Sequence, residues 1–519
     1  MPQPSIDIAF NNIYIYPDLV MKYLNNLNIS KSAGPDDIHP RVIYELRSNV
    51  VETLTKIYNK SLEAGKLPDD WKHAIIKPIH KKGKKGDPSN YRPVSLTSVP
   101  CKILERIIRD NIVEFLENND LFNINQHGFR AGRSCTTQLL EIMEIWTDLM
   151  EKNIPFDVIY LDFSKAFDKV PHTRLCNKLK AIGIKGNTLE WIKDFLNKRT
   201  QSVRINDSIS GVRPITSGIP QGSVLGPILF LVFINDLPNE ISSAVKIFAD
   251  DTKIFRALRA GEDHIHLQED LVKLFEWSCK WLLPFNTSKC KILHFGKNNP
   301  SYNYFLNNDL IKADPYEKDL GITFNNALNF AKHIRLTVAK ANSRLGMIKR
   351  NFSNLSPQVF LPIYKALIRP LLEYGSCIWN PHLIYEINEI EKVQRRATKT
   401  IQEIRLLPYN ERLKYLKLDS LKFRRRRYDI IQVFRILKGI DNISPNMFFE
   451  LHTGPNTRGH SLKLQKPRAT KNIRLYSFSH RIIHDWNNLK QRTIDKITLN
   501  SFKTALKKEW EYHPDRFYE

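Results

Sequence analysis

The stretch KIFADDTKIF, residues 246–255, places two adjacent aspartates at the centre of an apolar segment. Asp250 and Asp251 are both charged at neutral pH, and adjacent negative charges repel more strongly away from water. Aromatic and β-branched residues flank the pair, which predicts a β-hairpin with the aspartates at its tip. A polar hairpin turn is enough to explain such a pair on its own. The alternative is that chemistry requires two carboxylates there.

Another aspartate follows an apolar run earlier in the chain, in VIYLDFSKAFD (158–168). The run predicts a buried strand that ends at Asp162, with a helix beginning at Ser164. Taken alone, either residue is explained as a helix cap. Between this strand and the hairpin lies the Gly- and Pro-rich loop GIPQGSVLGP (218–227). The three features in this order are far more specific than any one of them.

Strand-end and hairpin-tip carboxylates meet when their strands lie side by side in one sheet. Three carboxylates in one place repel strongly unless divalent cations neutralise them. Mg²⁺ suits such a site because it takes hard oxygen ligands and leaves room for phosphate oxygens. Two such ions activate an attacking oxygen and stabilise a leaving oxygen in phosphoryl transfer. The sequence therefore predicts two Mg²⁺ ions, with Mn²⁺ as an alternative, at Asp162, Asp250 and Asp251.

Length and charge indicate several packed units and a polyanionic partner. A chain of 519 residues exceeds one ordinary core, so two or three units are expected. The net charge is +25, and residues 325–519 hold 37 basic and 16 acidic residues, a net of +21. A basic segment of this size indicates nucleic acid as the partner. A solvated surface with a solubility bias is the alternative.

The cysteines and the apolar runs exclude several classes of protein. The six cysteines form no CxxC pair, which argues against a zinc ribbon and a disulfide framework and fits a reduced, intracellular protein. Buried structural cysteines are favoured over a metal site at Cys279, Cys290 and His294. No uncharged apolar run reaches 18 residues, and the longest, GPILFLVFIN (226–235), has core length. Neither a signal peptide nor a membrane partner is expected.

Three segments, YLDFSKAFD, GIPQGSVLGP and FADD, resemble core motifs of the reverse transcriptases of non-LTR (LINE) retrotransposons, especially the Jockey-like group. Other segments resemble the same family in order and spacing: SAGPDDIHP, HKKGKKGDPSNYRPVSL, NQHGFRAGRS, NTSKCKILHFG and LIRPLLEYGSCIWNP. The resemblance implies an α+β right-hand polymerase with fingers, an antiparallel palm sheet, a thumb and a helical C-terminal region. The implied domains are a helical N-terminal extension (1–59), fingers and palm (60–324), and thumb with the basic helical C-terminal region (325–519).

The resemblance also implies roles for the residues of the carboxylate site. Asp162 and Asp250 match the main metal ligands, and Asp251 matches the third acidic position. The backbone carbonyl of Phe163 would complete the site. Phe167 matches the bulky residue that blocks a ribose 2′-OH, which implies dNTP as the substrate. A core aromatic is the alternative for Phe167, and both can hold.

Other residues match positions that contact the substrate in the family. Gln221 and Gly222 match the loop that packs against the incoming nucleotide and template, where Gly permits close backbone approach. Arg92 and Lys77 match fingertip residues that hold the triphosphate, and an Arg fork suits phosphate oxygens. Lys289 is the candidate acid that protonates pyrophosphate.

The template and primer contacts are expected on two further segments. Arg130 and Arg133 would line the template path, with a solvated face as the alternative. Leu320 and Gly321, in YEKDLGITF, match the primer-grip strand, although the tyrosine of that motif is displaced. Asp168 is as well explained by a capping or structural role as by a catalytic one.

Two basic runs have several explanations. The KKGKK loop (81–85) is expected to be a phosphate grip or a solvated loop. For the RRRR run (424–427), RNA binding, nuclear import and a solvated helix face remain open.

The implied activity is that of an RNA-directed DNA polymerase, with an RNA template, a DNA primer or target DNA, and dNTP. Family members usually carry an endonuclease domain before the polymerase. None is expected here, so a DNA nick would come from elsewhere. The nucleus is the expected place of function, with the cytoplasm as the alternative. An inactive nucleic-acid-binding remnant is the rival hypothesis, and an RNA-templated RNA polymerase is a third, against which Phe167 argues.

Overall fold

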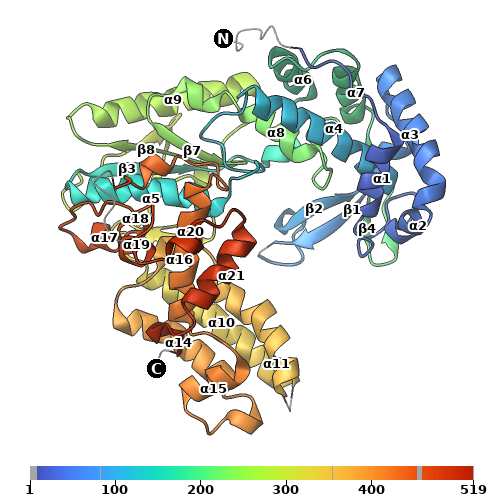
Figure 1. Ribbon diagram of the computed structural model, residues 1–519. Coiled ribbons are helices and arrows are strands. Elements are labelled where there is room, and N and C mark those ends of the chain that lie inside the picture. The colour runs from blue at the N-terminus through green and yellow to red at the C-terminus, as the bar shows by residue number, and fades with distance from the viewer. Residues whose placement is uncertain (1–8, 82, 353–354, 453–458, 518–519) are drawn as a thin grey trace.

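The computed structural model describes residues 9–81, 83–352, 355–452 and 459–517. These residues form an α+β structure with a central sheet, a lobe that holds the N-terminal helices, and a helical lobe that holds the C-terminus (Figure 1). This confirms the fold class. None of the described helices combines the length and the apolar character that a bilayer crossing requires.

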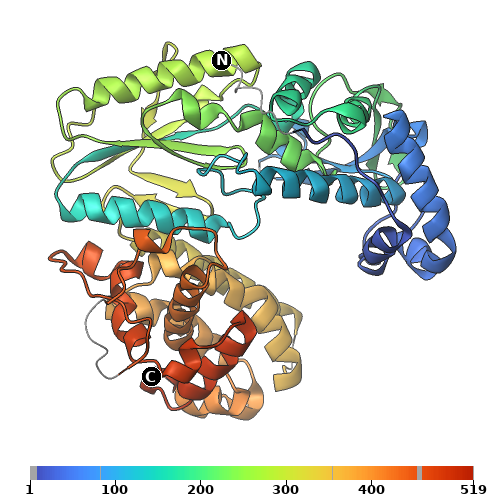
Figure 2. The same cartoon turned by 45° about the horizontal axis from the view of Figure 1, so that its top comes forward.

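The palm sheet has five strands in the order β12, β9, β3, β8, β7. Their bounds are β3 (Phe156–Leu161), β7 (Ala244–Phe248), β8 (Asp251–Ala257), β9 (Lys291–Phe295) and β12 (Lys312–Ala313). All neighbours are antiparallel except β12 and β9, which are parallel. Helix α5 (Cys135–Glu151) covers one face, and α9 (Asp263–Trp281) lies over the other (Figure 2). The predicted hairpin around FADD is confirmed as β7 and β8.

The palm sheet separates two hydrophobic cores. On β3, Val158 enters the second core, which runs from Leu139 to Trp510 and includes α5 and the C-terminal helices. The next residue, Ile159, enters the first core, which runs from Ile13 to Ile311 and includes α9. Successive side chains of a strand point to opposite faces, so β3, β8 and β9 contribute side chains to both cores. The sheet thus joins the two lobes by burial on both faces.

The lobe with the N-terminal helices is built on a second sheet. Strand β1 (His73–His80) pairs antiparallel with β2 (Tyr91–Leu96) and parallel with β4 (Thr200–Ile205). Two short strands, β5 (Ser208–Ile209) and β6 (Arg213–Pro214), flank β4. The helices of this lobe are α1 (Pro17–Asn25), α2 (Pro40–Glu45), α3 (Arg47–Ala64), α4 (Val99–Asn118), α6 (His172–Ala181), α7 (Gly186–Leu196) and α8 (Gly226–Ile234). The boundary expected after residue 59 falls inside α3, whose apolar residues belong to the first core.

The chain after β9 forms two hairpins and is then helical. The hairpins are β10 (Phe305–Leu306) with β11 (Asp309–Leu310), and β13 (Tyr316–Asp319) with β14 (Ile322–Asn325). The helices are α10 (Ala331–Asn351), α11 (Pro357–Ile363), α12 (Arg369–Glu373), α13 (Ser376–Trp379), α14 (Ile384–Thr398), α15 (Tyr409–Leu416), α16 (Leu421–Leu437), α17 (Asn472–Leu475), α18 (Phe478–Arg481), α19 (Ile483–Asn487), α20 (Gln491–Ile494) and α21 (Leu499–Glu509). The boundary expected after residue 324 falls at the end of β14.

Two local predictions were wrong. The helix expected from Ser164 is a single 3₁₀ turn, Ala166–Lys169, preceded by Lys165 with φ +52°. The primer-grip strand expected at YEKDLGITF is a hairpin instead, whose turn is Leu320 (φ +45°) and Gly321 (φ +91°). In both places a left-handed residue ends the regular backbone, and an apolar pattern does not reveal such a residue.

The RRRR run lies on α16 and is tied into the helical lobe. Arg424 forms an ion pair with Glu373, and Arg426 pairs with Asp485 and Asp515. Arg425 is 1% exposed and donates from Nε to Asn380. A solvated helix face is therefore wrong for these three arginines, because their guanidinium groups connect α16 to neighbouring segments.

Replacing Arg424 with Gln is expected to lower the free energy of unfolding by about 1–3 kcal/mol, because the mostly buried Glu373 keeps only its longer ion pair with Arg369 (3.7 Å). Urea denaturation measures this cost. Arg492→Gln, at an exposed position on α20, is the matched control and should change stability by less than about 0.5 kcal/mol. Unchanged stability with weakened RNA binding in Arg424→Gln would instead support the RNA-binding role.

A buried histidine predicts a pH dependence of stability. His333 on α10 accepts from the Thr323 N–H through Nδ1 (3.3 Å) and packs against Trp379. Burial lowers the pKa of His333 to about 4. The unfolded chain binds a proton below about pH 6.5 and the folded chain does not, so this stability is lost as the pH falls from 6.5 towards 4.

Between pH 7 and pH 5, the wild type should lose about 2 kcal/mol more stability than His333→Gln. Chemical denaturation at the two pH values gives this difference directly. His484→Gln is the control, because its side chain is 81% exposed. Equal losses in the wild type and His333→Gln would show that His333 is protonated in the folded protein.

Candidate active site

The antiparallel register of β3 and β8 brings the aspartates together. Leu161 pairs with Thr252, so the next residue along β3, Asp162, continues towards Asp251 at the same end of the sheet. This is the meeting of strand end and hairpin tip that the sequence predicts. It depends on one pairing between segments more than 90 residues apart in the chain.

The β7–β8 hairpin has a two-residue turn. Phe248 pairs with Asp251, which leaves Ala249 and Asp250 at the tip. Ala249 has φ +56°, a left-handed conformation that costs energy in a residue with a side chain. Its N–H donates to Oε1 of Gln126 (3.0 Å), which is 2% exposed. Sequence reasoning missed Gln126 as a support of this turn, although it lies in NQHGFRAGRS.

The two carboxyl groups of the hairpin have raised pKa values. Burial raises the pKa of Asp250, and the negative charge of Asp162 adds to the rise. The Asp251 side chain reaches solvent, yet the protein atoms around it and the charge of Asp250 raise its pKa to about 6. Two positive charges, Lys81 and Arg92, act on Asp250 in the opposite sense. The site is thus an acidic centre faced by cations.

The end of β3 is fixed by the segment that precedes β9. Lys289 forms an ion pair with Asp162 (Nζ to Oδ2, 2.9 Å). The Asn286 N–H donates to the Asp162 carbonyl (2.7 Å), and the rings of Phe163 and Phe285 stack 4.5 Å apart. Lys289 therefore lies at the site, beside the first carboxylate, and its role as a proton donor stays a prediction.

The predicted triphosphate contacts lie on the sheet of the other lobe. Arg92 is exposed on β2, and its charge acts on Asp250. Lys77 is exposed on β1, opposite Val94. Lys81 follows β1 at the start of the KKGKK loop, and sequence reasoning gave it no individual role. Lys82 lies outside the described residues.

The loop with Gln221 and Gly222 forms hydrogen bonds both to β2 and to the 3₁₀ turn after β3. The Ser95 N–H donates to the Gln221 carbonyl (2.7 Å), and Gln221 Nε2 donates to Asp168 Oδ1 (2.9 Å). Gly222 has φ +115°, and a Cβ there would lie 2.7 Å from the Ser95 carbonyl oxygen. Only glycine fits this approach. The bond from Gln221 gives Asp168 a structural role.

Phe167 is half-buried on the same 3₁₀ turn. Its ring stacks on Phe230 of α8 (4.5 Å, 21°), and its carbonyl accepts from the Ile219 N–H (2.8 Å). The core-aromatic role is thus present in the structure. A gate against ribose stays a prediction, and the two roles are compatible.

Arg130 and Arg133 make contacts within the protein. Arg130 pairs with Glu117 (2.6 Å) and packs over the Phe122 ring. Arg133 donates to the Ile124 carbonyl (2.7 Å), and its Nη1 lies 3.2 Å from His127 Nε2. A template contact by either arginine stays a prediction.

The predicted primer-grip turn is attached to the catalytic hairpin. Lys253 of β8 and Asp319, the last residue of β13, form an ion pair whose side chains are 2% and 3% exposed. The charge of Asp319 also raises the pKa of Asp251. The Leu320–Gly321 turn therefore begins beside the carboxylates.

The donor atoms suit a hard cation held by few protein ligands. Among the described residues, no group of three or more His, Cys, Asp or Glu side chains is arranged to hold a metal ion. The compact cluster of three carboxylates expected from the sequence is therefore not formed. Mg²⁺ commonly takes one or two carboxylates together with substrate phosphates. Asp162 and Asp250, with charges that act on each other, fit this arrangement.

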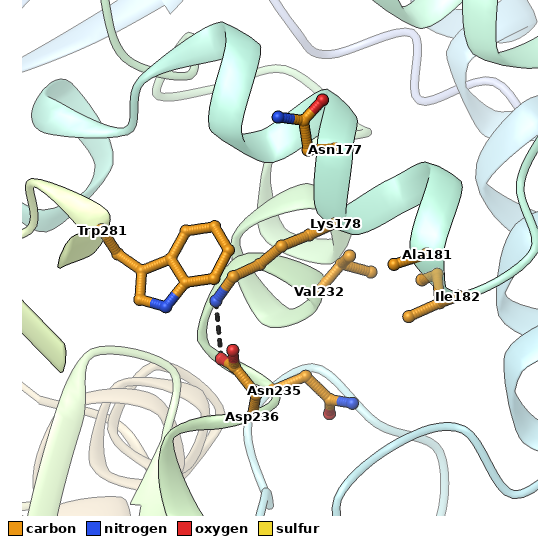
Figure 3. A pocket seen from close by; sticks show the side chains of 8 residues that line it. All are labelled: Asn177, Lys178, Ala181, Ile182, Val232, Asn235, Asp236 and Trp281. Atoms are coloured by element: carbon orange, nitrogen blue, oxygen red, sulfur yellow. Dashed lines mark hydrogen bonds and ion pairs between the residues drawn. The ribbon is translucent and has the colours of Figure 1, made fainter. Parts of the chain in front are cut away.

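A pocket of about 70 Å³ lies apart from the predicted site residues (Figure 3). Lys178 of α6 reaches into it and donates to Asp236 Oδ1 (2.6 Å). Its ammonium also lies 3.7 Å from the centroid of the Trp281 ring. Burial lowers the pKa of Lys178 to about 8. The lysine anchors α6 to the segment after α8 and to the last residue of α9, which is a structural role.

With this geometry in view, residues 79–327 match the family described as reverse transcriptase (RNA-dependent DNA polymerase). This part of the chain is a reverse transcriptase domain. It contains all the predicted catalytic and substrate-contacting residues except Lys77, which lies two residues before it. Reverse transcriptases as a family act on nucleic-acid templates with dNTPs and divalent metal ions.

The reverse transcriptase domain and its surroundings are similar to proteins of non-LTR retrotransposons. The chain is 28% identical over 459 residues to the RNA-directed DNA polymerase from mobile element jockey of Drosophila melanogaster, covering 85% of this chain and 48% of the relative. It is 29% identical to the jockey polymerase of Drosophila funebris (77% and 45%). It is 28% identical to the probable RNA-directed DNA polymerase from transposon X-element of Drosophila melanogaster (74% and 43%). The chain spans about half the length of these relatives.

Proposed function

We propose that the chain is an RNA-directed DNA polymerase of the non-LTR retrotransposon type. It would join a dNTP to a primer 3′-OH on an RNA template and release pyrophosphate. The observation that carries the proposal is the β3–β8 register, which sets Asp162 beside the Asp250–Asp251 hairpin within a reverse transcriptase domain.

Asp162 and Asp250 are the proposed metal ligands, with the Phe163 carbonyl completing the site. Bound Mg²⁺, or Mn²⁺ in its place, would neutralise phosphate charge and activate the attacking oxygen. Burial and the charge of Asp162 raise the pKa of Asp250, and a bound cation would favour the charged form of both carboxylates, which supports this assignment.

The cations around the carboxylates suit a triphosphate. Arg92 and Lys81 act on Asp250 from the sheet of the other lobe, so a phosphate chain bound between them would meet positive charge on both sides. Lys77 would extend this contact along β1. Lys289 would hold a proton within reach of the leaving group. In phosphoryl transfer most of the catalysis comes from such positioning and charge stabilisation.

The template and primer would follow the basic surface of the rear segment. Residues 325–519 carry a net charge of +21, which favours nucleic acid with strong salt dependence. Target DNA or another DNA end would serve as the primer. The nucleus is the proposed place of function because chromosomal DNA lies there.

An inactive nucleic-acid-binding remnant is the rival function. The basic rear segment alone favours it, because that segment would bind RNA whether or not the site turns over. The intact constellation of Asp162, Asp250 and Gly222 argues for activity. The two functions differ in turnover with dNTP.

Asp250→Asn is expected to abolish primer extension on RNA with Mg²⁺ and dNTPs, by about a thousandfold or more, because it removes a metal-binding charge. Template–primer binding should stay within about twofold, because the basic surface is unchanged. Extension is read on gels at equal template occupancy. Tight binding without extension by the wild type, across several divalent ions and primers, would favour the remnant.

Phe167→Val is expected to admit NTPs by opening the space beside the ribose. The measurement is the ratio of kcat/KM for dNTP to that for NTP, which should fall at least tenfold. Phe230→Leu, which alters the ring that stacks on Phe167, is the control for loosened packing. An unchanged ratio in Phe167→Val would leave only the core-aromatic role.

A further inference from the structure

The Leu320–Gly321 turn lies where its position matters to the reaction. It begins directly after Asp319, whose charge acts on Asp251 and whose carboxylate pairs with buried Lys253. A primer end that reacts at these carboxylates must come close to the turn. This role of the turn rests on the proposed polymerase function.

A tyrosine from the rear helices holds this turn from outside the hairpin. The Tyr374 hydroxyl, directly after α12, donates to the Leu320 carbonyl (2.8 Å). Its ring covers Gly321 closely, since a Cβ on Gly321 would lie 2.9 Å from Tyr374 Cε1. The next residue, Gly375, packs equally closely on Ile322. Tyr374 and Gly375, the two residues after α12, thus pack along the backbone of the turn.

Tyr374 is itself fixed in place. Its carbonyl accepts from Nε1 of Trp379, which is 1% exposed (2.8 Å). Burial and the neighbouring Cys135 side chain, at the start of α5, raise the pKa of its hydroxyl. The side chain of Tyr374 nevertheless leaves the residue 47% exposed. Because the ring of Tyr374 is so exposed, it contributes little to the hydrophobic core, although its backbone and hydroxyl are both hydrogen-bonded.

The turn is therefore held from two directions. The Lys253–Asp319 ion pair fixes it to β8 and so to the FADD hairpin. Tyr374 fixes it to the helical lobe, 54 residues further along the chain. Leu320 and Gly321 both have positive φ, and Leu320 gains no intrinsic stability from that conformation.

We propose that Tyr374 is a positioning residue for the primer end. Its hydroxyl and ring fix the position of the Leu320–Gly321 turn relative to the palm sheet. The turn then supports the terminal primer nucleotide. The position of the helical lobe is thereby transmitted to the site of reaction through one side chain. Tyr374 touches neither metal nor nucleotide in this role.

The test is Tyr374→Phe, which keeps the ring and removes only the hydroxyl. The KM for primer–template should rise about fivefold to tenfold, as expected for one lost hydrogen bond. The KM for dNTP and the melting temperature should stay unchanged. If Tyr374 had only a structural role, the variant would instead have a lower melting temperature, and the ratio of the KM for primer–template to the KM for dNTP would equal that of the wild type. Tyr385→Phe is the matched control, since its hydroxyl donates only to the adjacent Glu386.

Hydrogen exchange gives a readout that does not need turnover. The amides of residues 320–322 should exchange faster in Tyr374→Phe than in the wild type, with those of β3 unchanged. Equal exchange, or an unchanged KM for primer–template in an active enzyme, would overturn the inference. A wild type that fails to extend any primer would count against the polymerase function, while the exchange result would still decide whether Tyr374 holds the turn.

Discussion

The structure depends on one strand pairing, the antiparallel register of β3 with β8. Leu161 opposite Thr252 sets Asp162 beside the hairpin tip, and it also assigns the apolar side chains of these strands to one of two cores. A shift of one residue would reverse both faces of the strand. It would expose Ile159 and Ile254 to the wrong core and move the carboxylates apart. The packing of both lobes thus enforces the geometry of the site.

The sequence predicted what depends on pattern and order. Alternating apolar residues around FADD predicted the hairpin, and the strand before Asp162 was predicted from its buried run. The sequence could not reveal supports that come from distant segments. Gln126 bonds to Ala249 across more than 120 residues, and the charge of Lys81 acts on Asp250 from the loop after β1. Left-handed residues such as Lys165 and Leu320 were missed because their conformation is imposed by tertiary contacts.

Charge has two different uses in this chain. The arginines of α16 balance acidic side chains within the helical lobe, so a basic run need not indicate a binding surface. At the hairpin, Lys289 pairs with Asp162 and the charges of Lys81 and Arg92 act on Asp250, yet burial and the neighbouring carboxylates raise the pKa values of Asp250 and Asp251. Paired charge stabilises the lobe, whereas half-buried carboxylates that repel one another favour a bound cation.

The palm sheet is a wall shared by both cores, and this has a consequence for dissection of the chain. All the proposed catalytic residues precede residue 325, yet the face of the sheet that bears Phe156, Phe255 and Phe295 is covered with help from the helices that follow. A catalytic fragment cut at that point would keep Trp146 of α5 over these rings, but it would expose the face of α5 that packs against α13, α17 and α18, and it would tend to aggregate. The catalytic unit and the folding unit are therefore of different size. The rear helices have to be present for the chemistry, whatever else they bind.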